Sequence, residues 1–334
     1  MKKFLLFLAS FFVGLGIFVF ILKTVGWQNI TAAFLVFDVW KGIIILGLTL
    51  LIMVTGSWRW KKILEERGVD VSNKEIFGAY LCGFALMFLV PIFVWGGELF
   101  RAYFLKEKKG VVWSKSIASV VIDRILEWTL SLIVIFTGGI FFFSSLGSLP
   151  LKLTIVFGAA FLFFLGGISF FYFKCIKKES LVGFFIKNDK NQLHEIEAEV
   201  FDFFKFNKKK TWEAIGIAVL WAALMYLRVV LLIFFLGKKI GAASALIILG
   251  FIYLAKMIPI PTSLGSHEAL QSFAFGSLGL GISTATAFTM IIRGVELLAA
   301  LIGFTILFRY SLILLKKIFF NKVEKIEEEN GLAE

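Results

Sequence analysis

The chain has 334 residues, of which 59% are hydrophobic and only 17% charged, whereas a soluble domain carries about a quarter charged residues. Its net charge of +12 comes from short basic patches between apolar runs, which is typical of membrane-protein loops and excludes a nucleic-acid-binding surface. Its two cysteines and two histidines lie far apart, so their spacing supports no zinc or iron–sulfur site and no disulfide framework, and we expect neither metal nor cofactor.

Apolar segments of about the length of a bilayer-spanning helix follow one another along the chain. The stretch from Phe4 to Leu22 contains no charged residue, and the same holds for the stretch from 153 to 173. The first is too long for a signal peptide and lacks a good cleavage site after it, so we expect it to be retained. The apolar segments lie at about 4–22, 42–58, 76–95, 117–143, 153–173, 212–236, 242–258 and 285–311.

The basic patches indicate how many of these segments span the membrane. Lysines and arginines follow the second, third and last segments, and nine lysines lie in 174–211. Because cytoplasmic loops accumulate such residues, all patches should lie on one side. This requires 76–95 and 242–258 to enter and leave on the same face. We therefore predict an all-α polytopic protein of the cell membrane, with six spanning helices, two re-entrant hairpins and both termini in the cytoplasm.

An internal repeat relates the two halves of the single transmembrane domain that we expect over 1–320. Rare polar residues recur in the same order at a nearly constant offset along the chain, which predicts repeats at about 4–143 and 153–311. With the topology above, the halves run antiparallel, which is the inverted-topology repeat found in many transporters. The matched pairs are Glu98 and Glu268, Gly110 and Gly279, Ser114 and Ser283, Arg124 and Arg293, Glu127 and Glu296, and Arg59 and Arg228.

Two polar segments lie outside the apolar ones. Within a linker at about 174–211, residues 195–204 alternate at helical spacing between charged and apolar types. This pattern predicts an amphipathic helix, either on the inner membrane surface or solvated as a linker. The tail at 321–334 is acidic, and we expect it to be disordered.

Charged residues within apolar helices are the first candidate site. Asp123, Arg124 and Glu127 lie within little more than one turn, and Arg124 and Glu127 can pair because they are three residues apart. Arg293 and Glu296 repeat this spacing. Each such residue near mid-bilayer costs on the order of 3 kcal/mol, so it must face the bundle interior. Either the two arginines hold a phosphate head group in a central cavity, or the pairs are structural locks between helices.

Two breaks in the apolar segments, at 95–101 and 259–268, form the second candidate site. Exposed backbone inside a membrane is tolerated only where it is buried in protein or lines a cavity, so these turns either meet as a gate or are ordinary re-entrant loops. His267 either relays protons or is a hydrogen-bonded structural residue, and Arg228 and Lys256 are expected to snorkel or pair. The candidate gate residues are Gly97, Glu98, Arg101, Pro259, Pro261, Gly265, His267 and Glu268.

The two breaks carry a family resemblance. Residues 96–105, followed by 118–124, resemble the first signature of the flippase-like, lysylphosphatidylglycerol synthase transmembrane family. Residues 259–268 with Arg293 and Glu296 resemble the second. The resemblance implies a lipid-handling membrane domain. In the two-part members, such a domain translocates an aminoacylated phospholipid that a separate soluble domain makes, and we expect no such soluble domain in this sequence.

Together these observations predict a flippase-like translocator of an anionic or aminoacylated phospholipid or of a polyprenyl-phosphate lipid. Two alternatives stay open, namely a membrane subunit of a lipid-modifying enzyme and a proton-coupled transporter of a small solute. The chain carries no soluble enzyme motif, so we expect no catalytic residue in it. The expected partners are membrane lipids, with a separate lipid-modifying enzyme in the second case.

Overall fold

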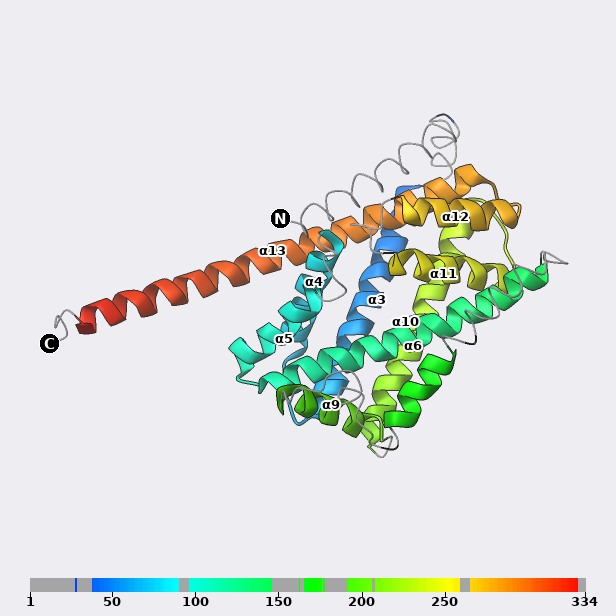
Figure 1. The fold of residues 1–334 in the computed structure, drawn as a ribbon. Helices are drawn as coiled ribbons and strands as arrows, with labels where there is room; N and C mark the ends of the chain where they lie inside the picture. The colour runs from blue at the N-terminus through cyan, green and yellow to red at the C-terminus, as the bar shows by residue number, and fades with distance from the viewer. Residues whose placement is uncertain are drawn as a thin grey trace, which may run out of the picture.

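A computed structural model describes residues 38–89, 96–145, 165–175, 191–205, 208–258 and 265–329, with a few isolated positions besides. The described chain is helical apart from short connections (Figure 1). Its helices are α3 (Val39–Glu66), α4 (Asn73–Leu89), α5 (Gly96–Lys109), α6 (Trp113–Ser145), α9 (Asn191–Phe203), α10 (Lys209–Phe235), α11 (Ala242–Met257), α12 (Ser266–Ser277) and α13 (Ile282–Glu329).

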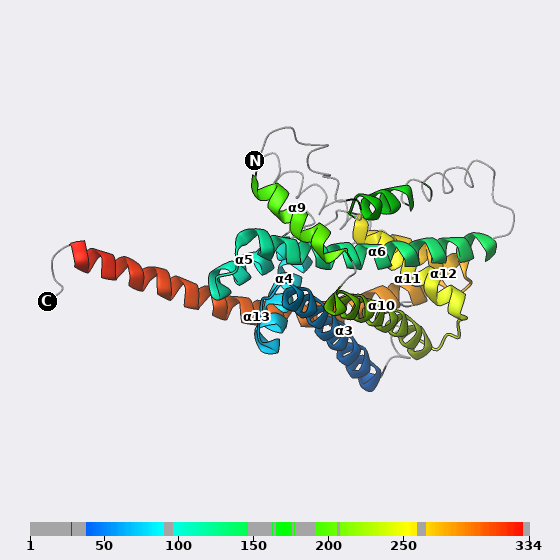
Figure 2. The same cartoon turned by 90° about the horizontal axis from the view of Figure 1, so that it is seen from below.

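Four of these helices are long and apolar enough to cross a membrane: α3, α6, α10 and the part of α13 from Ile282 to Tyr310. They include four of the six segments predicted to span. The segment 4–22 and most of 153–173 lie outside the described residues, although 165–175 is helical. α3 and α10 lie side by side (Figure 2). Large apolar side chains such as Trp40, Leu220 and Phe308 are exposed on the spanning helices, which suits a lipid-facing surface.

Two helical hairpins, α4–α5 and α11–α12, fill the space between the long helices. Glu75 at the start of α4 pairs with Lys109 at the end of α5, at 2.8 Å, so both ends of the first hairpin lie at one face. A Cβ on Gly97 would lie 2.0 Å from the backbone oxygen of Gly83, so only glycine allows the two arms to approach so closely. The basic segment that follows the apolar segment 76–95 belongs to the returning helix α5, because its apolar face packs against α4 and α6.

The helix contacts of the two halves correspond to each other. α4 packs against α13, and α11 packs against α6, so each hairpin lies against the long helix of the other half. Left-handed glycines also recur, at the same offset that separates the matched arginines of the repeat. Gly68 and Gly237 end α3 and α10 with φ of 74° and 75°, and Gly110 and Gly279 precede α6 and α13 with φ of 63° and 70°.

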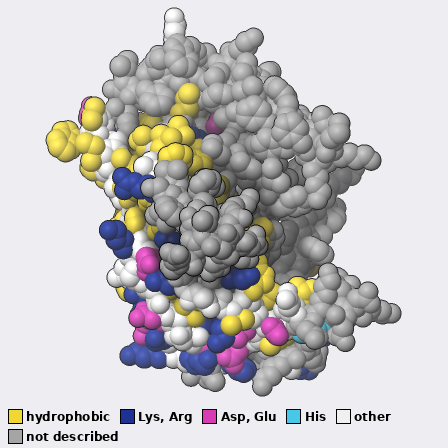
Figure 3. Space-filling view, turned by 90° about the vertical axis from the view of Figure 1, so that its left-hand side faces the viewer, with side chains coloured by type: hydrophobic (Ala, Val, Ile, Leu, Met, Phe, Trp, Pro, Cys, Tyr) yellow, Lys and Arg dark blue, Asp and Glu magenta, His cyan; other side chains and the backbone are white. Residues whose placement is uncertain are grey.

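The charged ends of several helices gather at one end of the bundle, which we call the basic face. There Lys62 pairs with Glu213 at 3.1 Å, and Lys208 pairs with Glu66 at 2.6 Å. Figure 3 shows charged side chains gathered at the lower end of the surface, with hydrophobic ones above them. The ends of α3, α5 and α9 and the starts of α4, α6 and α10 therefore share this face.

The amphipathic helix predicted near 195–204 is α9, and it uses its apolar face for protein contacts. Phe203 and Phe204 are fully buried in a cluster with Ile63 and Ala118, and Glu199 pairs with Arg67 at the end of α3. At the end of the same helix, Lys205 and Lys208 lower the pKa of Asp202 to about 2 by hydrogen bonding to its carboxylate. The helix is therefore docked on the basic face, and its place on the inner membrane surface stays a prediction.

The end of the chain differs from the prediction. α13 continues to Glu329, whereas the sequence predicted a disordered acidic tail from residue 321. The segment after Asn321 is rich in lysine and glutamate, which have high helix propensity. A helix that is already formed extends through such residues without a new nucleation step.

The close packing of α6 on α11 gives a test with a matched control. A Cβ on Gly138 would lie 2.7 Å from the backbone oxygen of Leu246, whereas one on Gly139 would meet nothing within 4 Å. We expect Gly138→Ala to destabilise the protein by about 1–3 kcal/mol, because overpacking forces the helices apart. Gly139→Ala should be neutral or slightly stabilising. Thermal unfolding in detergent measures both, and equal unfolding temperatures would show that α6 and α11 do not pack this closely.

Candidate functional site

The charged residues of the first half form one buried network around Asp123. Its two carboxylate oxygens accept hydrogen bonds from Arg59 on α3, at 2.6 Å, and from Arg101 on α5, at 2.8 Å. All three side chains are at most 2% exposed. One carboxylate therefore joins three helices and compensates two guanidinium groups.

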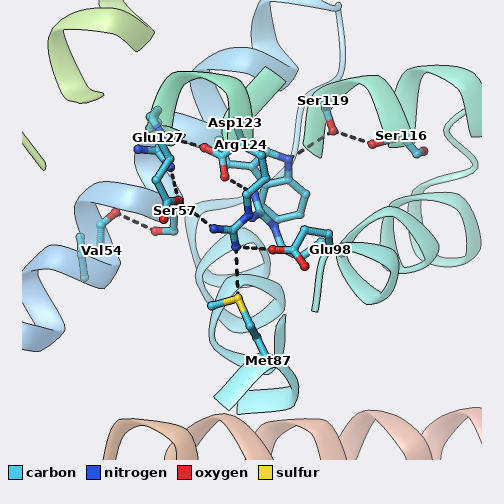
Figure 4. A network of polar contacts seen from close by, with 12 residues as sticks. Val54, Ser57, Met87, Glu98, Ser116, Ser119, Asp123, Arg124 and Glu127 are labelled. Atoms are coloured by element: carbon cyan, nitrogen blue, oxygen red, sulfur yellow. Dashed lines mark hydrogen bonds and ion pairs between the residues drawn. The ribbon is translucent and has the colours of Figure 1, made fainter. Parts of the chain in front are cut away.

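Arg124 lies on the next position of α6 and binds two further carboxylates (Figure 4). It forms an ion pair with Glu98 at the start of α5 and a bond of 3.0 Å with Glu127. Glu127 also accepts from Arg59 at 3.3 Å. The predicted pairing of Arg124 with Glu127 is confirmed, and the network extends it to α3 and α5.

Aromatic rings fix the arginines of this network. The Arg101 guanidinium lies 4.1 Å above the ring of Trp60 and 4.9 Å above that of Tyr80, and the indole of Trp60 donates to Ser119. Arg59 lies 5.4 Å above the ring of Trp221 on α10. Such contacts stabilise a desolvated cation and hold its orientation.

The second half repeats the core of this arrangement around Glu296. Arg228 on α10 contacts it at 3.4 Å, Arg293 on α13 at 3.8 Å and Lys256 on α11 at 3.9 Å. Arg228 also donates to Thr49 on α3 at 3.3 Å. Three basic side chains thus share one carboxylate, at longer distances than in the first half.

A cavity lies between the two networks. Together with its open mouth it contains about 620 Å³ of empty space, and its wall includes residues of both halves. Two carboxylates reach the wall, Glu127 and Glu296, and most of the remaining lining is apolar. The basic side chains in the wall are Arg101, Arg124, Arg228 and Lys256.

The structure brings most of the predicted binding residues to this cavity, with two differences. Arg124, Glu127 and Glu296 line it, while Asp123 lies behind the wall. Arg293 is not part of the wall, and Arg228 and Lys256 are. Of the two interpretations of Arg228, snorkelling or pairing, pairing is confirmed, since its side chain is buried and contacts Glu296. Its match to Arg59 in the internal repeat was the signal that could have identified it.

Some of the predicted gate residues line the cavity, some are buried in the protein, and some lie outside the described residues. Gly97 and Arg101 line the cavity, and Glu98 binds Arg124. In the second break, Glu268 is buried and accepts a hydrogen bond of 2.7 Å from the backbone N–H of Gly265, and His267 is buried beside it. Pro259 and Pro261 lie outside the described residues. Within the described chain, no three potential metal ligands lie together.

Comparison with known proteins agrees with this architecture. The family model for the lysylphosphatidylglycerol synthase TM region matches residues 7–303, which is most of the chain. The protein belongs to this family. A UPF0104 membrane protein, MJ1595 of Methanocaldococcus jannaschii, is 24% identical over 275 residues, covering 77% of this chain and 81% of the relative. The family resemblance of the two helix breaks is thereby confirmed, and the protein is a multi-pass membrane protein of this family.

The pairing of Asp123 predicts a large effect of its removal. Asp123→Asn leaves Arg59 and Arg101 buried without their shared carboxylate, and loss of one partner from a buried ion pair costs about 3–5 kcal/mol. The matched control is Glu75→Gln, which breaks the half-exposed pair with Lys109 and should cost at most about 1 kcal/mol. We expect a clear fall of the unfolding temperature in detergent only for Asp123→Asn, and similar temperatures would contradict the buried network.

Proposed function

We propose that this membrane protein translocates a phosphate-bearing lipid through the cavity between its two halves. The observation that carries the proposal is the charge of the wall, where four basic side chains face two carboxylates. Basic groups at membrane depth are costly unless they serve a ligand or a partner. Arg101 and Arg124 also pair with Asp123 and Glu98 behind the wall, so the excess of positive charge lies with Arg228 and Lys256. A lipid phosphate supplies the missing negative charge.

The rest of the lining suits a lipid as well. Apolar side chains from α3, α4 and α10, among them Ile52, Phe84 and Met225, share the wall with the charged ones. An acyl or prenyl chain can contact these groups while its head group binds the guanidinium groups. Arginine is suited to this because its planar fork donates two parallel hydrogen bonds to phosphate oxygens.

The same proposal includes a topology of six spanning helices and two re-entrant hairpins, arranged as an inverted repeat in the cell membrane. Its support is the correspondence of helix contacts between the halves, together with the shared face of the two ends of α4–α5. The basic face and both termini then lie in the cytoplasm, as the distribution of lysine and arginine favours.

Cysteine labelling tests this topology. In a chain whose buried Cys82 and Cys175 are replaced by alanine, Glu107→Cys and Lys209→Cys should react with a membrane-impermeant maleimide only from the cytoplasmic side. Lys239→Cys, in the connection between α10 and α11, should react only from outside. Labelling of Glu107→Cys and Lys239→Cys from the same side would exclude the six-plus-two topology.

Translocation is tested with purified protein in vesicles that contain a fluorescent phosphatidylglycerol. Dithionite bleaches only the outer leaflet of protein-free vesicles, so we expect bleaching beyond half of the label when the protein is present. A fluorescent glucosylceramide, whose head group lacks phosphate, is the matched control and should stay at half. Equal transfer of both lipids, or of neither, would contradict a phosphate-selective translocator.

One substitution links this activity to the wall. Arg124→Lys keeps the positive charge but lacks the fork that binds Glu98 and Glu127 at once. We expect translocation of phosphatidylglycerol to fall about tenfold or more, since a single charge-assisted hydrogen bond contributes about 1.5–3 kcal/mol. The unfolding temperature is measured in parallel, and full activity in this variant would remove Arg124 from the proposed binding site.

The two alternative functions give different results in these assays. A membrane subunit of a lipid-modifying enzyme would bind the lipid but leave it in its leaflet until the enzyme partner is added. A proton-coupled solute transporter would move no labelled lipid and would acidify or alkalinise vesicles only in the presence of its solute. The lipid assay with both head groups therefore separates all three.

A further inference from the structure

The two halves of the protein differ in how their basic residues are compensated. The shared pattern is a carboxylate with two arginines. Glu127 binds Arg59 and Arg124 at 3.3 and 3.0 Å, and Glu296 binds Arg228 and Arg293 at 3.4 and 3.8 Å. The differences lie in the residues added to this pattern on each side.

The first half adds carboxylates until its charges balance. Asp123 takes Arg59 and Arg101, and Glu98 takes Arg124, at close ion-pair distances. Its three arginines thus face three carboxylates. At the corresponding positions of the second half, Asp123 is replaced by Ile292, and neither Leu270 nor Gln271 carries the charge of Arg101.

The second half adds a cation instead. Lys256 occupies the position that corresponds to Met87 and lies 3.9 Å from Glu296. Glu268 accepts the backbone N–H of Gly265 and pairs with none of the three basic side chains at ion-pair distance in the described part of the chain. Three cations therefore share the single carboxylate of Glu296, and counting Glu268 as a second carboxylate still leaves one positive charge in excess.

The hydrogen bonding of these cations is also incomplete. Arg228 is 2% exposed, yet its Nε donates no hydrogen bond within the described chain, and the same holds for Nε and one terminal nitrogen of Arg293. Lys256 is the most accessible of the three, with 41% of its side chain exposed, and both Lys256 and Arg228 line the cavity. Buried nitrogens without acceptors also occur on the first-half arginines, at Arg59, Arg101 and Arg124. The excess of positive charge at the second-half wall is therefore the feature that favours an anion there.

We propose that the second half holds the anion site, in which Lys256 and Arg228 bind a phosphate group while the first-half network around Asp123 serves as a fixed structural frame. The excess of positive charge matches a phosphate group, which carries one negative charge as a diester and up to two as a monoester. Across the cavity, Glu127 pairs with Arg59 and Arg124, and of these two arginines Arg124 lines the wall. This inference rests on the proposed function and assigns its head group to one side of the cavity.

Binding measurements on the full chain in maltoside micelles test the assignment. The lipid probe is dihexanoyl phosphatidic acid, the second probe is inorganic phosphate, and calorimetry gives the affinity. We expect Lys256→Met, which copies the residue of the first half, to weaken binding of the lipid probe about tenfold or more. Lys256→Arg should stay within about threefold of the wild type. The control Lys238→Met, on an exposed lysine between α10 and α11, should bind as the wild type does.

The outcomes separate this inference from the proposed function. Wild-type affinity in Lys256→Met, while the wild type binds and translocates phosphatidylglycerol, would overturn the second-half site and leave the function standing. Arg228→Lys, which keeps the charge without the fork, should weaken the same probe, and unchanged affinity there would count equally against the site. If the wild type neither binds the lipid probe nor translocates phosphatidylglycerol, the proposed function itself fails. Binding of inorganic phosphate as tight as that of the lipid probe would support the site but contradict a lipid as its occupant.

Discussion

The ion pair between Arg59 and Asp123 is the contact on which the arrangement of the first half depends. Both side chains are fully buried and 2.6 Å apart, and a buried charge that loses its partner costs about 3–5 kcal/mol. Because Asp123 also binds Arg101, α3, α5 and α6 can meet only where the two guanidinium groups reach one carboxylate. The cost of buried charge thus becomes a geometric constraint, and it determines where the first hairpin lies against the long helices.

The cavity follows from the same constraint. Arg59 and Asp123 are fully buried and lie behind the wall, whereas Arg124 and Glu127 retain 15% and 20% exposure and reach it. On the opposite side, Arg228 contacts Thr49 of the first half, so the two networks approach each other across α3 and α10. The polar interior is therefore continuous between the halves, while the outer surfaces of the spanning helices remain apolar.

Much of the fold could be predicted because apolar length and the placement of lysines are local properties of the sequence. The four described spanning helices and the pair of Arg124 with Glu127, three residues apart, are of this kind. Arg59 and Asp123 are far apart in the sequence, and no local pattern specifies their pairing. The apolar segment 42–58 ends just before Arg59, although α3 continues to Glu66. The sequence likewise shows that Lys256 ends an apolar helix, which is typical of snorkelling, but not that a cavity lies beside it.

The two halves differ in how closely ion pairs hold their helices together. In the first half, close ion pairs join the hairpin α4–α5 to α3 and α6 through Asp123 and Glu98. In the second half, α11 contributes Lys256, α10 contributes Arg228 and α13 contributes Arg293, and all three meet only at Glu296, at 3.4 to 3.9 Å. Longer pairs with one shared partner constrain the helices less. An anion bound between Lys256 and Arg228 would supply the second shared partner, so its arrival would tighten α10 and α11 against α13. The loosely paired half is thus the one whose geometry a bound head group can change.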